Sequence, residues 1–382
     1  GTVSLNDINL SYLLSDSLTG TREVHTLVAG QTLAVESSNP NDPGAALFEF
    51  PLRLNGGTLR VDAVAGNDFS NVDWDAGSLE LLRSNLTVGT AGLLGGTVVM
   101  NAGQQLHVHQ AVTVQANGTL SVTGDAATAE TNEQFAAGSL GVFGLAVFTS
   151  TQVDTDADET GNGLFNNGRV VLIDSELTGP VVNQGSLTLV GDSAINGGDF
   201  AQNADGALEV SLDPAQLAAP MLDLSGTADL DGVLDLDTDA TNFALLPYQA
   251  TTLIEAAELV GTFDQVRGVE INPQESLAVT YTPTAVRITR AIRGDANLSG
   301  QVEQGDLNSV LNNWGSTGNT WASGDLTGDG VVNQADLNAV LNNWGATAAP
   351  DFTGSAVPEP TAALGLVGLG LLARRREPLR AR

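Results

Sequence analysis

A five-residue cassette, Gly-x-apolar-x-apolar, recurs about every 20 residues over the N-terminal half of this 382-residue chain. It occurs eight times, at spacings of 20, 19, 22, 20, 30, 17 and 21 residues. The cassettes begin at Gly57, Gly77, Gly96, Gly118, Gly138, Gly168, Gly185 and Gly206. The alternation predicts a short strand with one buried face. Nearby turn residues such as Asn117 and Asn167 predict corners where Gly or Asn supplies a positive φ.

A turn-plus-strand unit of this length is typical of a solenoid, in which each rung buries its apolar face only against its neighbours. We therefore expect a mainly β chain with a right-handed parallel β-helix over about residues 40–220, inside a first domain of residues 1–222 with an N-terminal cap. Equivalent positions should form two buried ladders: Leu59, Leu79, Val98 and Leu120 in one, and Val61, Leu81, Met100 and Val122 in the other. The alternative is an antiparallel sandwich, which also has closely spaced short strands.

Residues 223–292 change in character and include the acidic run DLDGVLDLDTD at Asp229–Asp239. The run is either a solvated strand face or a weak cation site. The segment loosely resembles the region that follows β-helical passengers in autotransporter-like surface proteins. That resemblance implies a β-sandwich-like cap over the open edge of the solenoid.

A 22-residue block near the C-terminus occurs twice, at 294–315 and 324–345, with 14 of 22 positions identical. Each copy begins with a loop rich in oxygen ligands and a Gly at the sixth loop position, as a Ca²⁺ site requires. The candidate ligands of the first loop are Asp295, Asn297, Ser299, the Gln301 carbonyl, Glu303 and Asp306. Those of the second are Asp325, Thr327, Asp329, the Val331 carbonyl, Asn333 and Asp336. The sequence predicts two bound Ca²⁺ ions.

A short amphipathic helix should follow each loop, burying Leu307, Val310, Leu311, Leu337, Val340 and Leu341 between the two helices. Duplicated EF-hand-like loops with Asp at position 12 and a helix only on the C-terminal side resemble the type I dockerin module, here residues 293–346. The resemblance implies a cohesin-like partner. Positions 10 and 11 are Gln304–Gly305 and Gln334–Ala335 instead of the Ser/Thr-type residues common in cellulosomal dockerins. The alternative is a metal-stabilised helix pair that only joins domains.

The formal net charge is −31, from 14 Arg and 45 acidic residues with no Lys. Such a surface repels nucleic acid and anionic lipid and suits a medium rich in divalent cations. There is no Cys, so thiol chemistry is excluded. His107 and His109 lie on one face of a predicted strand, but two ligands do not make a metal site, and no nucleophile motif accompanies them.

The C-terminal tail has a Pro-Glu-Pro triplet at Pro358, Glu359 and Pro360, then an uncharged stretch at 361–373 and three arginines, Arg374, Arg375 and Arg376. As a helix the stretch spans about 20 Å, short of a hydrocarbon core of about 30 Å. The arrangement resembles the PEP-CTERM sorting signal, here residues 357–382 after a linker at 347–356. The resemblance implies transient membrane contact, processing by an exosortase-type enzyme, and export to the cell surface, outer membrane or extracellular matrix of a Gram-negative-type bacterium.

We expect an exported structural or binding protein, non-catalytic, whose calcium module stiffens or docks its C-terminal end. The alternative is a β-helical carbohydrate-active enzyme that degrades polysaccharide and is tethered by its dockerin-like module. A groove lined by paired carboxylates and stacked aromatics would favour the enzyme. Aromatic residues make up only 5% of the chain, which favours the non-catalytic protein.

Overall fold

Every second side chain is buried in most strands of the protein, as the cassette pattern predicts. The strand Arg169–Ile173 is typical: Val170 and Leu172 are buried, while the residues between them face outwards. The structure, a computed structural model, describes residues 2–6, 25–36, 52–61, 72–89, 94–124, 133–158, 161–212, 219–238 and 245–348. The expected sorting signal at 357–382 lies outside these residues.

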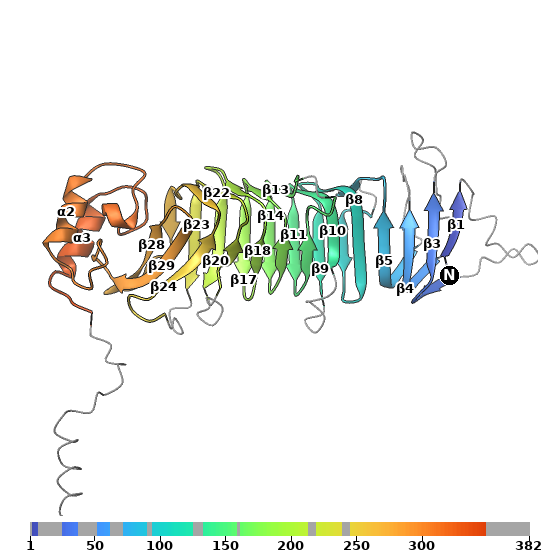
Figure 1. Cartoon of the computed structure of the whole chain (residues 1–382), viewed down its shortest axis with the longest axis horizontal. Coiled ribbons are helices and arrows are strands. Elements are labelled where there is room, and N and C mark those ends of the chain that lie inside the picture. Colours follow the sequence, from blue (N-terminus) through green and yellow to red (C-terminus); the bar gives the residue numbers. More distant parts are fainter. Residues whose placement is uncertain are drawn as a thin grey trace, which may run out of the picture. The chain divides into compact units, whose positions relative to one another are not determined.

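The strands belong to two sheets whose neighbouring strands are parallel over most of their length (Figure 1). The eight-stranded sheet consists of β7 (Thr97–Met100), β9 (Thr119–Thr123), β11 (Leu145–Thr149), β14 (Arg169–Ile173), β17 (Ser186–Val190), β20 (Ala207–Leu212), β23 (Val233–Thr238) and β26 (Gln265–Arg267). Each strand pairs with the next in this order. The antiparallel sandwich is therefore wrong.

Two further rows of parallel strands belong to the 21-stranded sheet. One row is β12 (Gln152–Asp154), β15 (Glu176–Thr178), β18 (Ala194–Asn196), β21 (Leu222–Asp223) and β24 (Ala250–Glu255). The other is β13 (Leu164–Asn166), β16 (Val181–Asn183), β19 (Phe200–Gln202), β22 (Thr227–Leu230) and β25 (Glu258–Gly261). Both rows begin at β10 (Glu133–Val142), and each turn of the chain here adds one strand to every row, so the arrangement is compatible with a solenoid.

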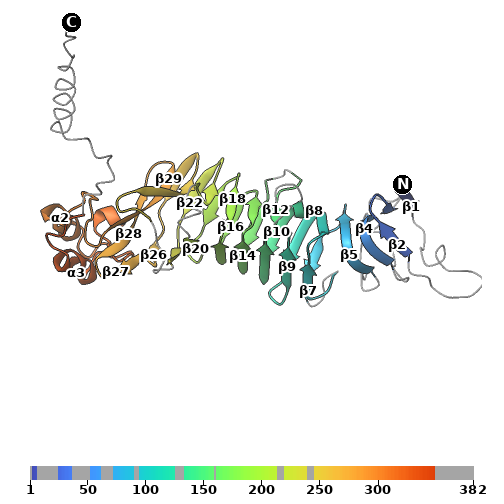
Figure 2. The same cartoon turned by 90° about the horizontal axis from the view of Figure 1, so that it is seen from below.

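The same sheet holds the strands nearer the N-terminus, which also pair in parallel (Figure 2). They are β1 (Thr2–Asn6), β2 (His25–Val28), β3 (Thr32–Glu36), β4 (Leu52–Val61), β5 (Val72–Leu81), β6 (Leu86–Val88) and β8 (Gln104–Val114). Each expected ladder is confirmed in two halves: Leu59 pairs with Leu79, and Val98 pairs with Leu120. The step between the halves is wrong, because Leu79 pairs with Leu106 of β8, whereas Val98 lies in the other sheet. The cassette pattern can occur in a strand of any row of the solenoid-like arrangement, so similar cassettes belong to different rows.

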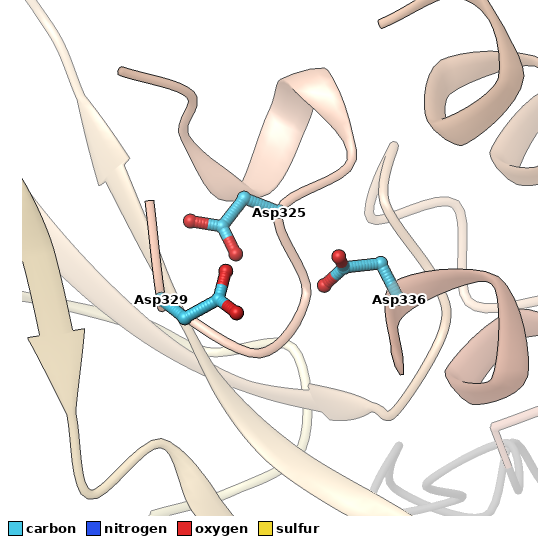
Figure 3. Close-up of side chains that lie close together, drawn as sticks. All are labelled: Asp325, Asp329 and Asp336. Atoms are coloured by element: carbon cyan, nitrogen blue, oxygen red, sulfur yellow. The ribbon is translucent and has the colours of Figure 1, made fainter. Parts of the chain in front are cut away.

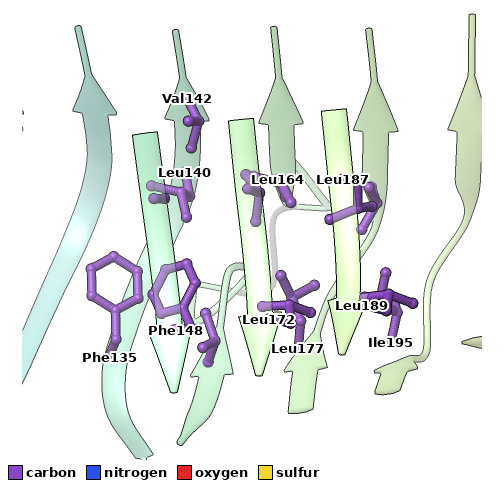
Figure 4. Packing of buried hydrophobic residues seen from close by; sticks show 14 of the residues in the cluster. Phe135, Leu140, Val142, Phe148, Leu164, Leu172, Leu177, Leu187, Leu189 and Ile195 are labelled. Carbon is purple, nitrogen blue, oxygen red and sulfur yellow. The ribbon is translucent and has the colours of Figure 1, made fainter. Parts of the chain in front are cut away.

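Buried ladders do form within each row (Figure 4). Ala146, Val170, Leu187, Leu208 and Leu234 are in register on successive strands of the eight-stranded sheet, and Phe148, Leu172, Leu189, Val210 and Leu236 form the parallel ladder beside them. Methyl and phenyl groups therefore meet at the strand spacing of about 4.8 Å. These stacked contacts form the core between the sheets.

Glycine is required at the corners because the backbones of successive turns lie close together, as well as for its backbone conformation. The cassette glycine Gly77 has the positive φ expected at a corner, 102°, whereas Gly168 and Gly185 do not. A Cβ atom at Gly185 would instead lie 2.2 Å from the carbonyl oxygen of Gly168 in the preceding turn. Glycine is needed there because any side chain would push two turns apart.

A ladder of buried amides runs beside these corners. Asn166 donates from Nδ2 to Oδ1 of Asn183 at 2.8 Å, and Asn183 donates to Oε1 of Gln202 at 2.9 Å. Gln202 in turn donates to the carbonyl oxygens of Asp231 and Val233 at 2.9 Å each. Because each amide both donates and accepts, polar side chains that are almost completely buried keep their hydrogen bonds.

Parallel pairing continues past the boundary expected at residue 223, through β21 to β26. Leu234 and Leu236 explain this, because they extend the buried ladders of the preceding turns. Antiparallel pairing begins only with β29 (Ala285–Ile292), which joins β24 to β28 (Glu275–Tyr281), and with β27 (Glu270–Asn272) beside β28. The duplicated block follows, with α2 (Gln304–Asn312), the short 3-10 helix η1 (Trp321–Ser323) and α3 (Gln334–Asn342).

The helices bury a different stripe from the one expected. Val310 and Val340 are buried and Leu307 and Leu337 are half-buried, but Leu311 and Leu341 are each 51% exposed. The reason is that position 12 of each loop, Asp306 or Asp336, lies in the first helical turn and is itself buried. The buried stripe therefore runs from the aspartate to the valine four residues later.

Candidate metal site in the duplicated loops

Three carboxylates converge in the second loop, residues 325–336. Asp325, Asp329 and Asp336 each offer an oxygen atom within 4.8 Å of the others (Figure 3). Asp325 follows η1 and Gly324, whereas Asp336 lies in the first turn of α3. Among the described residues no arginine forms an ion pair with these carboxylates. The group could hold a metal ion.

Backbone amides fix two of these carboxylates. Asp325 accepts hydrogen bonds from the amides of Gly328 and Gly330, both at 2.9 Å. Asp336 accepts from the amides of Thr327 at 2.9 Å and Asn333 at 2.8 Å. The loop thus wraps around its own acidic side chains and presents oxygen atoms inwards.

Burial makes this acidic group costly without a cation. It raises the pKa of Asp325 to about 6, and the nearby charges of Asp336 and Asp329 add to the increase. The amide hydrogen bonds from Gly330 and Gly328 act in the opposite direction. A divalent cation would neutralise the repulsion among the three groups, so the all-oxygen donor set fits a hard metal ion.

The first loop, residues 295–306, has the same two buried aspartates as the second and also three carboxylates in all, but its third carboxylate is Glu303 at position 9. Asp295 and Asp306 are fully buried. Asp295 accepts from the amides of Ser299 at 3.0 Å and Gly300 at 2.8 Å, and Asp306 accepts from the amide of Glu303 at 2.8 Å. Position 5 is Ser299, so the first loop lacks the carboxylate that Asp329 supplies in the second, and the exposed Glu303 is the N-cap of α2.

The neutral candidate ligands lie around the amide-bound aspartates of each loop. Asn297 accepts from the amide of Ser299 at 2.9 Å, and the Gln301 carbonyl accepts from the Ser299 hydroxyl at 3.1 Å. Thr327 donates its hydroxyl to Asp336 at 2.9 Å. Asn333 donates to Asp329 at 3.0 Å and to the carbonyl of Val331 at 3.1 Å.

Two residues that the sequence did not single out touch the first loop. Tyr248 donates its hydroxyl to Oδ2 of Asp295 at 2.7 Å, and Trp321 donates from Nε1 to the Asp295 carbonyl at 2.9 Å. Burial raises the pKa of Tyr248, so its phenol remains a donor at neutral pH. No local spacing could have indicated Tyr248, because it precedes Asp295 by 47 residues.

The second loop also contacts the eight-stranded sheet. The amide of Val266, in the edge strand β26, donates to the carbonyl of Gly328 at 2.8 Å. A Cβ atom at Gly328 would lie 2.0 Å from the carbonyl oxygen of Val266. The equivalent position of the first loop is Leu298, which adopts a φ of 56° despite its side chain. Gly328 is therefore needed because the second loop lies too close to the strand for a side chain.

The other candidate residues do not assemble into a site. His107 and His109 lie on β8, and neither belongs to a metal-ligating cluster among the residues that the structure describes. In the acidic run, Asp235 faces outwards between buried Leu234 and Leu236, as expected of a solvated strand face. Within the described ranges, no helix has the length and apolarity needed to cross a membrane.

No protein-family model, curated protein or solved structure matches the chain.

Proposed function

We propose that the protein is an exported, calcium-binding structural or binding protein without catalytic activity. In this proposal the parallel strands form a right-handed β-helix, a β-sandwich-like cap follows it, and a dockerin-like module binds two Ca²⁺ ions. The observation that carries the proposal is the convergence of Asp325, Asp329 and Asp336 in a loop that contacts the edge of the parallel sheet.

The donor set favours Ca²⁺ over softer metals. All candidate ligands are oxygen atoms from carboxylates, amides, hydroxyls and backbone carbonyls, and Gly300 and Gly330 have φ values of 83° and 82° at the turn of each loop. Zinc and copper sites use His or Cys ligands, which both loops lack. A flexible loop with six or more oxygens suits Ca²⁺ better than the smaller Mg²⁺, which demands a strict octahedral geometry.

Calcium in the second loop would stiffen the end of the parallel sheet. The edge strand β26 presents backbone groups that would otherwise remain unpaired and open to other chains. Its Val266 amide is paired with the second loop through Gly328. A bound Ca²⁺ ion neutralises the three carboxylates and keeps this loop closed. The ion therefore stabilises the sheet through the contact of the loop with β26.

Export, membrane contact through 361–373, an exosortase-type processing enzyme and a cohesin-like or polysaccharide partner remain part of the proposal. They are supported by the sequence of the tail and of the duplicated block. The strongly acidic composition argues against a nucleic acid partner. The surface of the outer membrane or an extracellular matrix supplies the divalent cations that the loops need.

Titration calorimetry of the full chain tests the calcium proposal. We expect two binding events with the wild type. Asp329→Asn should remove the second, because it deletes one charge and leaves the Asp325 and Asp336 frame intact. Asp205→Asn, at an exposed turn, is the matched control and should bind as the wild type does. No binding heat at millimolar calcium would refute the assignment.

A carbohydrate-active enzyme is the second candidate, and one observation favours it. A groove of 580 Å³ over β17, β20 and β23 is lined by Glu209, Asp235, Asp237 and Glu270. Carboxylate pairs across a groove are the machinery of glycoside hydrolysis. The residues that line this groove include no aromatic side chain. Release of reducing sugar from a polysaccharide panel, lost in Glu209→Gln and Asp235→Asn, would establish the enzyme.

A further inference from the structure

Tyr248 connects three segments that are distant in sequence. It lies before β24 with a φ of 61°, and its amide donates to the carbonyl of Arg290 in β29 at 2.9 Å. Its hydroxyl accepts from the amide of Ile292 at 3.1 Å and donates to Asp295 at 2.7 Å. The phenol hydroxyl therefore both accepts and donates a hydrogen bond. Its orientation is fixed by the antiparallel strands.

Among the described residues, an outside side chain donates to the first aspartate of the first loop but not to that of the second. Asp295 accepts from the loop amides of Ser299 and Gly300, and its Oδ2 accepts in addition from Tyr248. The equivalent Asp325 accepts from the amides of Gly328 and Gly330 within its own loop. In the first loop Ser299 also replaces Asp329 at position 5, and the third carboxylate, Glu303, is exposed at the N-cap of α2. A site with fewer converging carboxylates gains more from ligands that are already oriented.

We propose that Tyr248 is a positioning residue for the first metal loop, so that the antiparallel strands complete this site by orienting Asp295. The proposal rests on the proposed binding of calcium. A carboxylate whose rotamer is fixed by a neutral donor loses less conformational freedom when the ion binds, and Oδ1 of Asp295, which accepts from Ser299, keeps a lone pair for the ion. Calcium in the first loop consequently stabilises β29 and the segment around Tyr248 together with the loop.

The test compares Tyr248→Phe with the wild type in the full chain by calcium titration calorimetry. Loss of an outer partner of a metal ligand typically costs about 10- to 100-fold in affinity. We expect that loss at the first site only, with the second site unchanged. Asp329→Asn is the matched variant and should show the reverse pattern. In the background of Asp295→Asn, Tyr248→Phe should have no further effect on calcium binding.

A second readout separates positioning from simple packing. If Tyr248 is only structural, Tyr248→Phe lowers the melting temperature in EDTA and leaves both calcium affinities unchanged, and the proposal is overturned. If the wild type binds no calcium, the proposed function fails first. If Tyr248→Phe does not fold, ¹³Cζ NMR of the wild type decides. The chain has three tyrosines, and the Tyr248 signal must shift as the first site fills. A signal that stays constant overturns the proposal.

Discussion

The two loops differ in charge at position 9, where Glu303 is replaced by Asn333, and at position 5, which is Ser299 in the first loop. Ser299 occupies the position of Asp329, and its hydroxyl donates to the carbonyl of Gln301. Ser299→Asp should raise the affinity of the first site for calcium, by about tenfold, because ligand charge tunes affinity in such loops. Calorimetric titration checks this, with Ser309→Asp in α2 as the control for added charge. Equal affinities in wild type and Ser299→Asp would mean that position 5 does not reach the ion.

Asn183 is the central amide of the buried ladder. Asn183→Ala removes the donor to Oε1 of Gln202 and one of the two acceptors of Asn166 Nδ2, which keeps its bond to the Ser186 carbonyl. We expect a loss of about 1–3 kcal/mol in the free energy of unfolding, measured with urea. Asn203→Ala, at an exposed position one turn on, should change it by less than about 0.5 kcal/mol. Similar losses in both variants would contradict a structural role for the ladder.

At the scale of elements, the second loop and β26 meet at Gly328. Gly328→Ala combines a positive φ of 75° with a clash against the Val266 carbonyl. Gly315→Ala has nearly the same φ, 77°, in open space and isolates the cost of the backbone conformation, about 1–2 kcal/mol. We expect Gly328→Ala to destabilise the calcium-loaded protein more, in urea unfolding. Equal effects would show that the loop does not need its close contact with the strand.

Arg290 and Glu275 join β29 to β28 through two hydrogen bonds, at 3.1 and 2.7 Å. These contacts hold the pKa of Glu275 below its usual value of 4.5. A lowered pKa in the folded state means that the stabilisation is present above the unfolded pKa and disappears as pH falls through the folded pKa. Glu275→Gln should therefore flatten the decline in stability below about pH 4.5, measured by urea unfolding at several pH values. An unchanged acid profile would contradict this.

The elements also show what the sequence can specify. Period-two burial and parallel stacking follow from the cassettes, since Val170 and Leu172 have the alternation of one buried face. The row of each strand does not follow, because β8 reaches Leu79 through a Gly-x-x-apolar variant, Gly103–Leu106, that the cassette misses. The paired frames of Asp295 and Asp306, and of Asp325 and Asp336, were predictable from loop spacing, whereas Tyr248 and Val266 reach the loops only through the tertiary fold.

At the scale of the whole molecule, we expect the C-terminal tail to control where the protein is delivered and to have no effect on calcium binding. Deletion of residues 357–382 should release soluble protein from expressing cells if, as we propose, the Pro-Glu-Pro triplet, the short apolar stretch and the three arginines act as a sorting signal. Calcium affinity, measured by calorimetry, should equal that of the full chain, since the loops end before this segment. A full-length chain that matures with Arg374, Arg375 and Arg376 intact would contradict the signal.

The contacts of both loops with the β-rich region argue against independent unfolding of the module at 293–346. A separate module would melt independently of the strands, whereas the apolar cluster of the module includes Ala278 of β28 and Ala291 of β29. Val266 and Tyr248 add hydrogen bonds from the same side. Calcium binding should consequently stabilise the end of the parallel sheet along with the helices.

The most direct test is the thermal unfolding of the full chain, followed by the β-sheet circular dichroism signal, in excess EDTA and in calcium. At a free concentration about 100 times the dissociation constant, each site adds about 2.7 kcal/mol to the stability of the unit to which it is coupled. We predict that calcium raises the melting temperature of the β-sheet signal, and that combining Asp325→Asn with Asp329→Asn abolishes about half of the increase, the share of the second site. A β-sheet transition at the same temperature in EDTA and in calcium would contradict the account.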